Sequence, residues 1–357
     1  MLDETTQSPV DVAGGLPPVA TKLDGLHERV QKIRDLKKIF VPYPGTERVT
    51  HALNHLLHYG NVGMEVGSPA RCLLLTGPSG SGKTALLHRW SAAFPRVEES
   101  LKTVCPVLYI EVPPNCSPKA LAEHMLRGLG VPEAFVAKGT EVSLTQRVKH
   151  HMREQEVRMV ILDEFQHFIN SENHRIIYKA ADFVKGLLNA AICPFVLAGT
   201  PEAAAVYEEN VQLMRRSFGR HMLKSFDWNC PEDCDLFRRF LDEYEQKLPF
   251  KEPSNLARKA IALRIHYFSR GLLGRAVDLL VAATIHALEA GEPCISHDVL
   301  RETVENFRDD ADPNWLNPFD EPELQPLGTL KPAEAPTRVT RLRKGARKPK
   351  QSDLLLT

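Results

Sequence analysis

The sequence lacks a net charge. Its 45 lysines and arginines are matched by 45 aspartates and glutamates among 357 residues. A single copy of such a chain has little long-range attraction for nucleic acid. Any contact with phosphate groups must therefore come from local clusters of basic residues, or from weak contacts that an assembly repeats.

Long apolar runs are also missing, and the cysteines form no ligand set. No run approaches the roughly 20 residues of a membrane-spanning helix, and residues 1–18 are unlike a signal peptide. The seven cysteines are scattered, and Cys72, Cys105 and Cys193 lie in apolar runs, which is typical of buried thiols in a reducing compartment. The pair in 230–234 has no second ligand pair, which argues against zinc. We expect no membrane partner.

Residues 77–84, GPSGSGKT, fit the pattern G-x-x-x-x-G-K-[ST] of a P-loop. Glycines let a chain wrap tightly, so that successive backbone N–H groups point at phosphate oxygens. The apolar run 72–76 predicts a buried strand before the loop, and 85–90 predicts a helix whose N-terminus faces the phosphates. We expect Lys83 to reach the β- and γ-phosphates and the Thr84 hydroxyl to hold Mg²⁺. The residues predicted to bind the nucleotide here are Pro78, Ser79, Gly80, Ser81, Gly82, Lys83, Thr84 and Ala85.

A second apolar run, 158–162, ends in Asp163 and Glu164. In P-loop NTPases an aspartate at such a strand end holds Mg²⁺. The glutamate beside it could orient and deprotonate the attacking water, which favours ATP hydrolysis over phosphoryl transfer to a small molecule. Thr200 ends a third predicted strand, where its hydroxyl could contact the γ-phosphate or the water. Because Pro201 follows, Thr200 also suits the cap of a helix.

Predicted strands and helices alternate through the first two thirds of the chain, which implies a parallel sheet with helices on both faces. Four further helical patterns without a strand predict a small all-α lid domain. The ends lack apolar periodicity, and the C-terminal one carries a basic run. The predicted organisation is a disordered segment at 1–21, a helix and extended linker at 22–45, an α/β ATPase core at 46–229, a helical lid at 230–308 and a Pro-rich basic tail, predicted to be disordered, at 309–357.

Arginines at two places could reach a nucleotide. Arg215, Arg216 and Arg220 lie at the end of a predicted helix. A guanidinium from a neighbouring subunit can stabilise charge on a transferring phosphoryl group, although a cation at a helix C-terminus is also favoured by the helix dipole alone. Arg275 lies at the start of a predicted lid helix. The helix dipole does not stabilise a cation at this end, so a contact with a nucleotide is the interpretation to test.

Taken in order, these segments resemble AAA+ ATPases, and more closely the TniB/TnsC family of transposition regulators. The resemblance covers about residues 26–305. Ser217-Phe218 departs from it, because the family more often has RRF there, and this blurs which arginine acts in trans. The segments that carry the resemblance are VPYP at 41–44, VLYIEVPP at 107–114, VILDEFQHF at 160–168, LAGTPEA at 197–203 and QLMRR at 212–216.

The resemblance implies a bacterial, cytoplasmic, DNA-associated ATPase that uses ATP and Mg²⁺. It implies a ring or helical homo-oligomer on double-stranded DNA that links a TniQ-like target selector to a DDE transposase of the TnsB/TniA type, with hydrolysis remodelling the assembly. It also implies that Val41 and Tyr43 lie on the adenine side of the nucleotide. DNA contacts are expected near Lys119, Lys138 and Thr140, although each of these equally suits an ordinary solvated loop.

Two other interpretations share these motifs. Another DNA-associated AAA+ protein, such as a helicase-loader-like remodeller, would have every residue named above. A P-loop kinase would normally lack both Glu164 and a helical lid carrying Arg275. Phosphate release without an acceptor separates an ATPase from a kinase, and a neighbouring transposase gene separates the two AAA+ interpretations.

Overall fold

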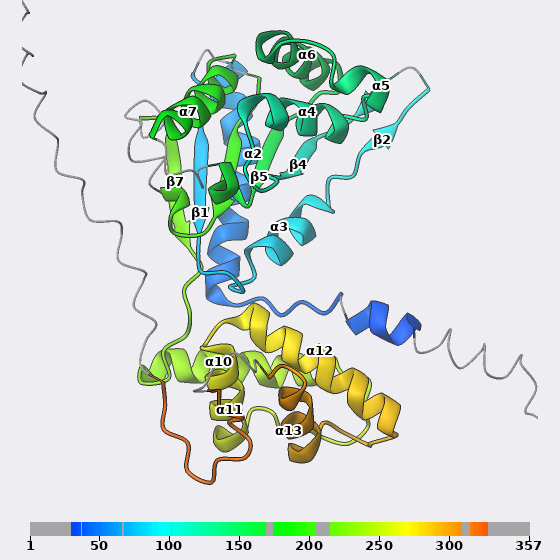
Figure 1. Ribbon diagram of the computed structural model, residues 1–357, viewed down its shortest axis with the longest axis vertical. Helices are drawn as coiled ribbons and strands as arrows, with labels where there is room; N and C mark the ends of the chain where they lie inside the picture. Colours follow the sequence, from blue (N-terminus) through cyan, green and yellow to red (C-terminus); the bar gives the residue numbers. More distant parts are fainter. Residues whose placement is uncertain are drawn as a thin grey trace, which may run out of the picture. The chain divides into compact units, whose positions relative to one another are not determined.

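The computed structural model divides the chain into two compact units (Figure 1). The described residues of 44–227 form the α/β unit, and those of 30–43 and 228–327 form the helical unit. The predicted disordered segment 1–21 and the basic run 338–350 lie outside the described residues. The structure describes residues 30–36, 38–65, 68–100, 102–168, 174–190, 192–204, 215–308 and 315–327.

Five parallel strands form the central sheet of the α/β unit, in the order β4-β5-β6-β1-β7. Every residue of β1, β5 and β6 is buried, as expected for parallel strands that helices cover on both faces. The strands are β1 Cys72–Thr76, β4 Val107–Glu111, β5 Met159–Asp163, β6 Phe195–Gly199 and β7 Ser217–Met222, and a separate hairpin pairs β2 Val97–Glu98 with β3 Thr103–Val104.

Helices connect and flank these strands. Ser117 caps α4, because its side chain accepts a hydrogen bond from the backbone N–H of Ala120 at 3.1 Å. Thr140 caps α6 in the same way through the N–H of Ser143 at 3.3 Å. The helices are α2 Pro44–Glu65, α3 Lys83–Ser91, α4 Pro118–Gly128, α5 Glu133–Val136, α6 Glu141–Glu154, the 3₁₀ turn η1 Phe165–Phe168 and α7 His174–Asn189.

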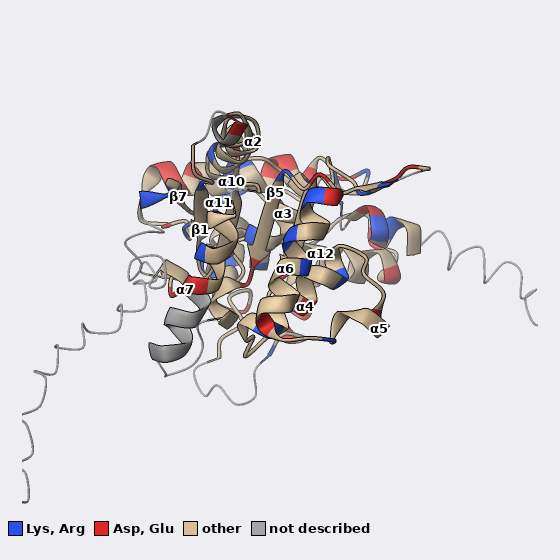
Figure 2. Ribbon diagram, turned by 90° about the horizontal axis from the view of Figure 1, so that it is seen from above, with Lys and Arg blue, Asp and Glu red and all other residues tan. Residues whose placement is uncertain are grey.

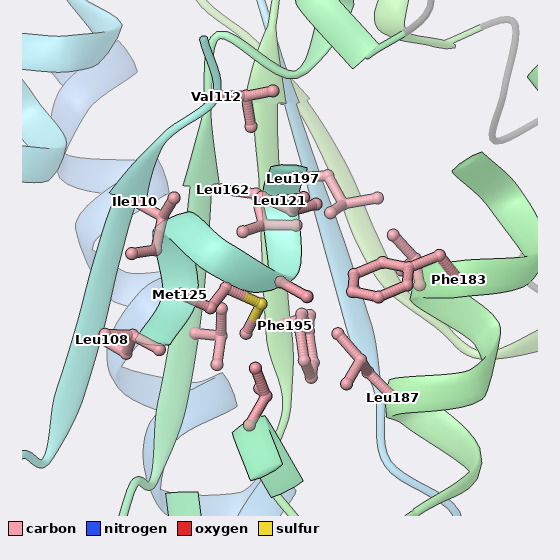
Figure 3. Packing of buried hydrophobic residues seen from close by; sticks show 14 of the residues in the cluster. Leu108, Ile110, Val112, Leu121, Met125, Leu162, Phe183, Leu187, Phe195 and Leu197 are labelled. Atoms are coloured by element: carbon pink, nitrogen blue, oxygen red, sulfur yellow. The ribbon is translucent and has the colours of Figure 1, made fainter. Parts of the chain in front are cut away.

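The hydrophobic core lies between the sheet and the helices α4 and α7 (Figure 3). Met125 of α4, Leu162 of β5, Leu187 of α7 and Phe195 of β6 belong to one buried cluster, and all four side chains are at most 1% exposed. This packing holds the carboxyl ends of β1, β5 and β6 in fixed positions, and those ends carry the predicted site residues.

The helical unit contains no strand among its described residues, in agreement with the predicted all-α lid. Its extended N-terminal segment is anchored within the unit, because the Lys247 ammonium donates to the Phe40 carbonyl at 2.7 Å. No single described helix is long and apolar enough to cross a membrane; α11 and α12 meet the criteria of length and composition only as a pair bent by 112°. The helices are a short one at 30–36, α10 Pro231–Glu245, α11 Lys259–Ser269, α12 Leu273–Ala290 and α13 His297–Glu305.

Two expectations from the sequence need correction. Residues 217–222 are not the end of a helix but β7, an edge strand whose SFGRHM sequence has no apolar run because its side chains are at least partly exposed. The tail expected to begin at 309 contains an ordered part at 315–327. There Phe319 is 3% exposed, and the Asn317 amide donates to the Arg301 carbonyl at 3.0 Å. One buried aromatic anchors such a segment without any periodic pattern.

Candidate functional site: a P-loop at the carboxyl edge of the sheet

The P-loop connects β1 to α3 and depends on glycine at three positions. Gly80 and Gly82 have φ angles of 80° and 89°, a region that side chains with a Cβ rarely adopt. A Cβ on Gly77 would lie 2.5 Å from the Leu223 carbonyl oxygen and 2.8 Å from the Ser81 hydroxyl. The glycines are therefore required both for the turn and for the close approach of neighbouring backbone.

Lys83 begins α3 and is only 4% exposed. Its ammonium donates to the carbonyl oxygens of Gly77 at 2.8 Å and Pro78 at 3.0 Å. These contacts hold the ammonium against the loop that is predicted to surround the phosphates.

Three carboxylates act electrostatically on this lysine. Burial lowers the pKa of Lys83, and the negative charges of Glu164 and Asp163 act in the opposite direction, followed by that of Glu202. Glu202 was not predicted as a site residue. The two predicted motifs, 77–84 and 163–164, thus meet at one edge of the sheet, as the parallel strands require.

Asp163 is fully buried at the end of β5, and both of its oxygens accept hydrogen bonds. The backbone N–H of Glu164 donates to Oδ1 at 2.8 Å, and the Tyr109 hydroxyl donates to Oδ2 at 2.7 Å. Burial, followed by this bond to Asp163, raises the pKa of Tyr109. The Tyr109 ring also lies 4.2 Å, centroid to centroid, from that of His88 on α3. Tyr109, which the sequence analysis did not single out, therefore contacts both Asp163 and the helix that follows the P-loop.

Glu164 has a left-handed backbone with φ at 53°, a conformation that non-glycine residues adopt mainly where surrounding contacts enforce it. Its carboxylate accepts a hydrogen bond from the Gln166 side-chain amide, and the Gln166 carbonyl oxygen accepts from the Thr200 backbone N–H at 3.0 Å. A Cβ on Gly199 would lie 2.4 Å from that oxygen. Gln166 thus links the candidate base, Glu164, to the end of β6. The sequence analysis did not predict this role of Gln166.

The residues present fit a hard divalent cation. Magnesium prefers carboxylate and hydroxyl oxygens with several waters, and Asp163 and Thr84 supply one group of each kind. Asp163 keeps lone pairs on both oxygens beyond the two hydrogen bonds described above. These two residues would hold Mg²⁺, which would neutralise negative charge on the phosphates of the nucleotide.

Arg215 and Arg216 lie at the amino ends of the strands, whereas their own P-loop lies at the carboxyl ends. The backbone N–H of Cys72, the first residue of β1, donates to the Arg216 carbonyl at 2.9 Å, whereas the P-loop follows Thr76, about 13 Å further along the strand. The Arg216 guanidinium donates to the Asn189 side chain at 2.6 Å, and Arg215 is exposed. Neither arginine is placed to complete the nucleotide site of its own subunit.

The remaining predicted nucleotide contacts belong to the helical unit. Val41 is 4% exposed, and Tyr43 is partly buried. Arg275 lies in the first turn of α12 with its guanidinium 5.9 Å from the Phe268 ring centroid, and burial lowers its pKa. The Arg275 guanidinium therefore packs against a side chain of its own unit. Its contact with a nucleotide remains a prediction.

The predicted DNA contacts do not form one cluster. Lys119 lies in the first turn of α4, 3.9 Å from the Glu123 carboxylate. Lys138 and Thr140 lie beyond the other end of this helix, which is about 16 Å long. Thr140 acts as the cap of α6, and the Lys138 ammonium lies 5.7 Å from the Phe135 ring centroid. Their contact with DNA stays a prediction.

A comparison with protein families decides the relationship. The model described as "Bacterial TniB protein" matches residues 29–228. The chain belongs to the TniB family. The match to TniB spans the predicted P-loop, the Asp163-Glu164 strand and both arginines at 215–216, and confirms the resemblance found in the sequence. A comparison of this TniB-family protein with curated proteins finds no match.

Solved structures of low sequence identity have a similar fold. The Aeropyrum pernix ORC2 protein in ADPNP–ADP complexes has a TM-score of 0.55 at 18% identity, covering 76% of this chain and 71% of that chain. Cdc6p from Pyrobaculum aerophilum has 0.53 at 19%, covering 76% and 70%. The Aeropyrum pernix ORC1 protein in complex with DNA has 0.53 at 18%, covering 78% and 69%. These similarities confirm the predicted P-loop AAA+ α/β fold of the TniB-family chain.

Replacing Gln166 by alanine is expected to slow ATP turnover by about 10-fold to 100-fold, because Glu164 loses the contact that orients its carboxylate. The KM for ATP is expected to stay within about 2-fold, since the hydrogen bonds of Gln166 join it to Glu164 and to the backbone of Thr200, not to the P-loop or Lys83. Steady-state phosphate release measures both constants. Gln146→Ala, an exposed change on α6, is the control, and unchanged turnover in Gln166→Ala would contradict the role.

Proposed function

We propose that this TniB-family protein is an ATP-hydrolysing regulator of DNA transposition in the bacterial cytoplasm. It binds ATP with Mg²⁺, assembles on double-stranded DNA as a ring or helical homo-oligomer, and links a TniQ-like target selector to a DDE transposase of the TnsB/TniA type. Hydrolysis remodels that assembly. The observation that carries the proposal is the meeting of Lys83, Asp163 and Glu164 at one sheet edge in a chain of the TniB family.

In the proposed reaction, the P-loop N–H groups and Lys83 bind the β- and γ-phosphates. Glu164 accepts a proton from the water that attacks the γ-phosphorus, the bond between the γ-phosphorus and the bridging oxygen breaks, and ADP and phosphate leave. Thr200 holds either the γ-phosphate or the water from the end of β6. Val41, Tyr43 and Arg275 contact the nucleotide from the helical unit.

The ligands of two solved structures with a similar fold support this proposal. One of them holds ADPNP and ADP, and another is a complex with DNA. A helicase-loader-like remodeller remains the second candidate, since it would use the same site. A kinase is less well supported, because Glu164 stands beside Asp163 as a candidate base for water.

Assembly is expected to require ATP and duplex DNA together. Electron microscopy and sedimentation of the full chain with a long duplex should detect rings or filaments with ATP and none with ADP. Phosphate should appear free in solution rather than on an acceptor, and a purified DDE transposase of the TnsB/TniA type should speed its release. ATP hydrolysis without any assembly on DNA would contradict the proposal and favour another kind of ATPase.

Arg216, or Arg215 beside it, is proposed to act on the nucleotide of a neighbouring subunit. Arg216→Ala is expected to bind ATP yet lose turnover by about 10³-fold. Mixing it with Lys83→Ala protein should restore activity, because one subunit then supplies an intact P-loop and its neighbour an intact arginine. Arg215→Ala is tested in the same way.

The Asn189→Ala variant is the matched control, because it removes the partner of Arg216 within the subunit and keeps the guanidinium. Retained turnover in Asn189→Ala together with loss in Arg216→Ala supports action in trans. Equal turnover in all single arginine variants, Arg220→Ala included, would refute it.

A further inference from the structure

A cavity of about 510 Å³ lies in the α/β unit, away from the P-loop. The end of α4, the segment around α5 and the second half of α6 surround it, together with Arg96 and Thr103 beside the β2–β3 hairpin. Figure 2 shows α4, α5 and α6 side by side in this part of the unit. We call it the basic cavity, because its lining includes Arg96, Lys138 and Arg147 and contains no aspartate or glutamate.

The three cations of the basic cavity have no acidic partner among the described residues, unlike two cations nearby. Lys102 pairs with Glu156, and Arg127 pairs with Glu133 at 2.8 Å. Within the part of the chain that the structure describes, no carboxylate lies within ion-pair distance of Arg96, Lys138 or Arg147. Three positive charges are therefore concentrated here without a carboxylate partner in the described part of the chain.

Backbone contacts hold the two guanidinium groups in place. Arg147 donates to the Lys138 carbonyl at 3.3 Å, and Arg96 donates to the Gly128 carbonyl at 3.4 Å. A Cβ on Gly130 would lie 2.3 Å from the Arg96 guanidinium, so this glycine makes room for it. Each guanidinium uses one nitrogen in these bonds, and the other N–H groups of its planar fork can still bind an anion.

An aromatic face and a histidine complete the lining. Phe135 is 56% exposed, with the Lys138 ammonium over its ring. Burial lowers the pKa of His151, the charges of His150 and Arg147 add to this effect, and Glu154 acts in the opposite direction. The histidine therefore experiences the positive potential of the cavity that it lines.

These features together fit one kind of ligand. Two arginine forks and a lysine match the several oxygens of a phosphate group. A volume of about 510 Å³ is in the range of pockets for small molecules and exceeds what a lone phosphate needs. Cations beside an exposed aromatic ring are the arrangement with which proteins bind nucleic-acid strands, the cations following the backbone and the ring stacking on a base.

We infer that the basic cavity binds the phosphate groups of nucleotide units, with a base or sugar against Phe135. The phosphate can come from a polynucleotide strand or from a free nucleotide. The polynucleotide source deepens the proposed association with DNA and rests on it, whereas the phosphate chemistry of the cavity does not. Arg96, Phe135, Arg147 and His151 then join Lys138 in one site, while Lys119 lies outside it.

The test uses the full chain without ATP and a fluorescently labelled oligothymidylate of about 12 nucleotides, followed by anisotropy at several salt concentrations. The Arg96→Ala/Arg147→Ala double variant should bind at least about 10-fold more weakly. Its salt slope should fall by about 0.7 for each lost phosphate contact. Phe135→Ala should lose about 5-fold or more, and Phe135→Trp should restore binding. Lys102→Ala, which removes a paired cation, should bind as the wild type does.

Competitors distinguish the sources of the phosphate. Displacement by dTMP at the same nucleotide concentration as unlabelled oligothymidylate assigns the site to free nucleotides. Displacement by the strand alone assigns it to a polynucleotide. Equal displacement by polyglutamate, no binding by the wild type, or an unaltered salt slope in the double variant would each overturn the inference.

The result that would refute the proposed function differs from the result that would refute the basic cavity. A wild-type chain that binds the oligonucleotide but never assembles on duplex with ATP would refute the regulator and leave the basic cavity standing. A double variant that binds the oligonucleotide like wild type while wild-type assembly is intact would refute the cavity alone.

Discussion

Replacing Glu164 by glutamine is expected to reduce ATP turnover by about 10²-fold to 10⁴-fold, the usual contribution of a general base. ATP binding should persist, because the amide keeps the shape of the side chain and its oxygen can still accept the hydrogen bond of the Gln166 amide. The variant should therefore hold ATP and remain assembled on DNA for longer than the wild type. Single-turnover phosphate release and filter binding of labelled ATP measure the two effects.

The matched control is Glu202→Gln. Glu202 also acts electrostatically on Lys83, but more weakly than Glu164, and its side chain is exposed. A loss of negative charge near the P-loop should affect both variants, whereas the loss of a base should affect Glu164→Gln alone. Turnover at the wild-type rate in Glu164→Gln would show that another group activates the water.

Replacing Lys83 by alanine is expected to weaken ATP binding by about 10-fold to 100-fold, the size of a lost hydrogen bond to a charged group. The ammonium lies against the P-loop carbonyls of Gly77 and Pro78, so its truncation removes the cation nearest to the phosphates. Because the truncation also leaves the two carbonyls without their charged donor, we expect the nucleotide-free protein to lose about 1–3 kcal/mol of its free energy of unfolding.

Thermal unfolding with and without ATP tests this prediction. The wild type should gain stability with ATP by mass action, and Lys83→Ala should gain little at the same concentration. Arg89→Ala, an exposed cation on the same helix, should keep the full gain. An equal gain in Lys83→Ala and the wild type would mean that the ATP site lies elsewhere.

The geometry of the candidate nucleotide site could be predicted from sequence because it depends on local patterns. Residues 77–84 need glycines to turn and to approach neighbouring backbone, and the structure puts positive φ angles at Gly80 and Gly82. The buried strands before the P-loop and before Asp163 are continuous apolar runs, as parallel strands covered on both faces must be. Since parallel strands present their carboxyl ends at one edge, the order of these runs was enough to bring Lys83 and Asp163 together.

Elements without such a pattern were harder to predict. The strand β7 pairs with β1 alone and exposes much of its surface, so its sequence has no apolar run to indicate it. The segment 315–327 is held by Phe319 and Asn317, single side chains with no periodicity. In both places the folded chain, rather than local propensity, stabilises the backbone.

The sequence by itself determined the P-loop, the acidic strand end and the alternation of strands and helices, because each depends on neighbouring residues. Only the tertiary structure decided the contacts between residues that are far apart in the sequence. Gln166 contacts Thr200, 34 residues away, and Arg216 lies at the end of the strands opposite to its own P-loop. Arg96, Lys138 and Arg147 surround one cavity. Such neighbours are set by strand order and helix packing, which bring side chains together over separations that no local spacing encodes.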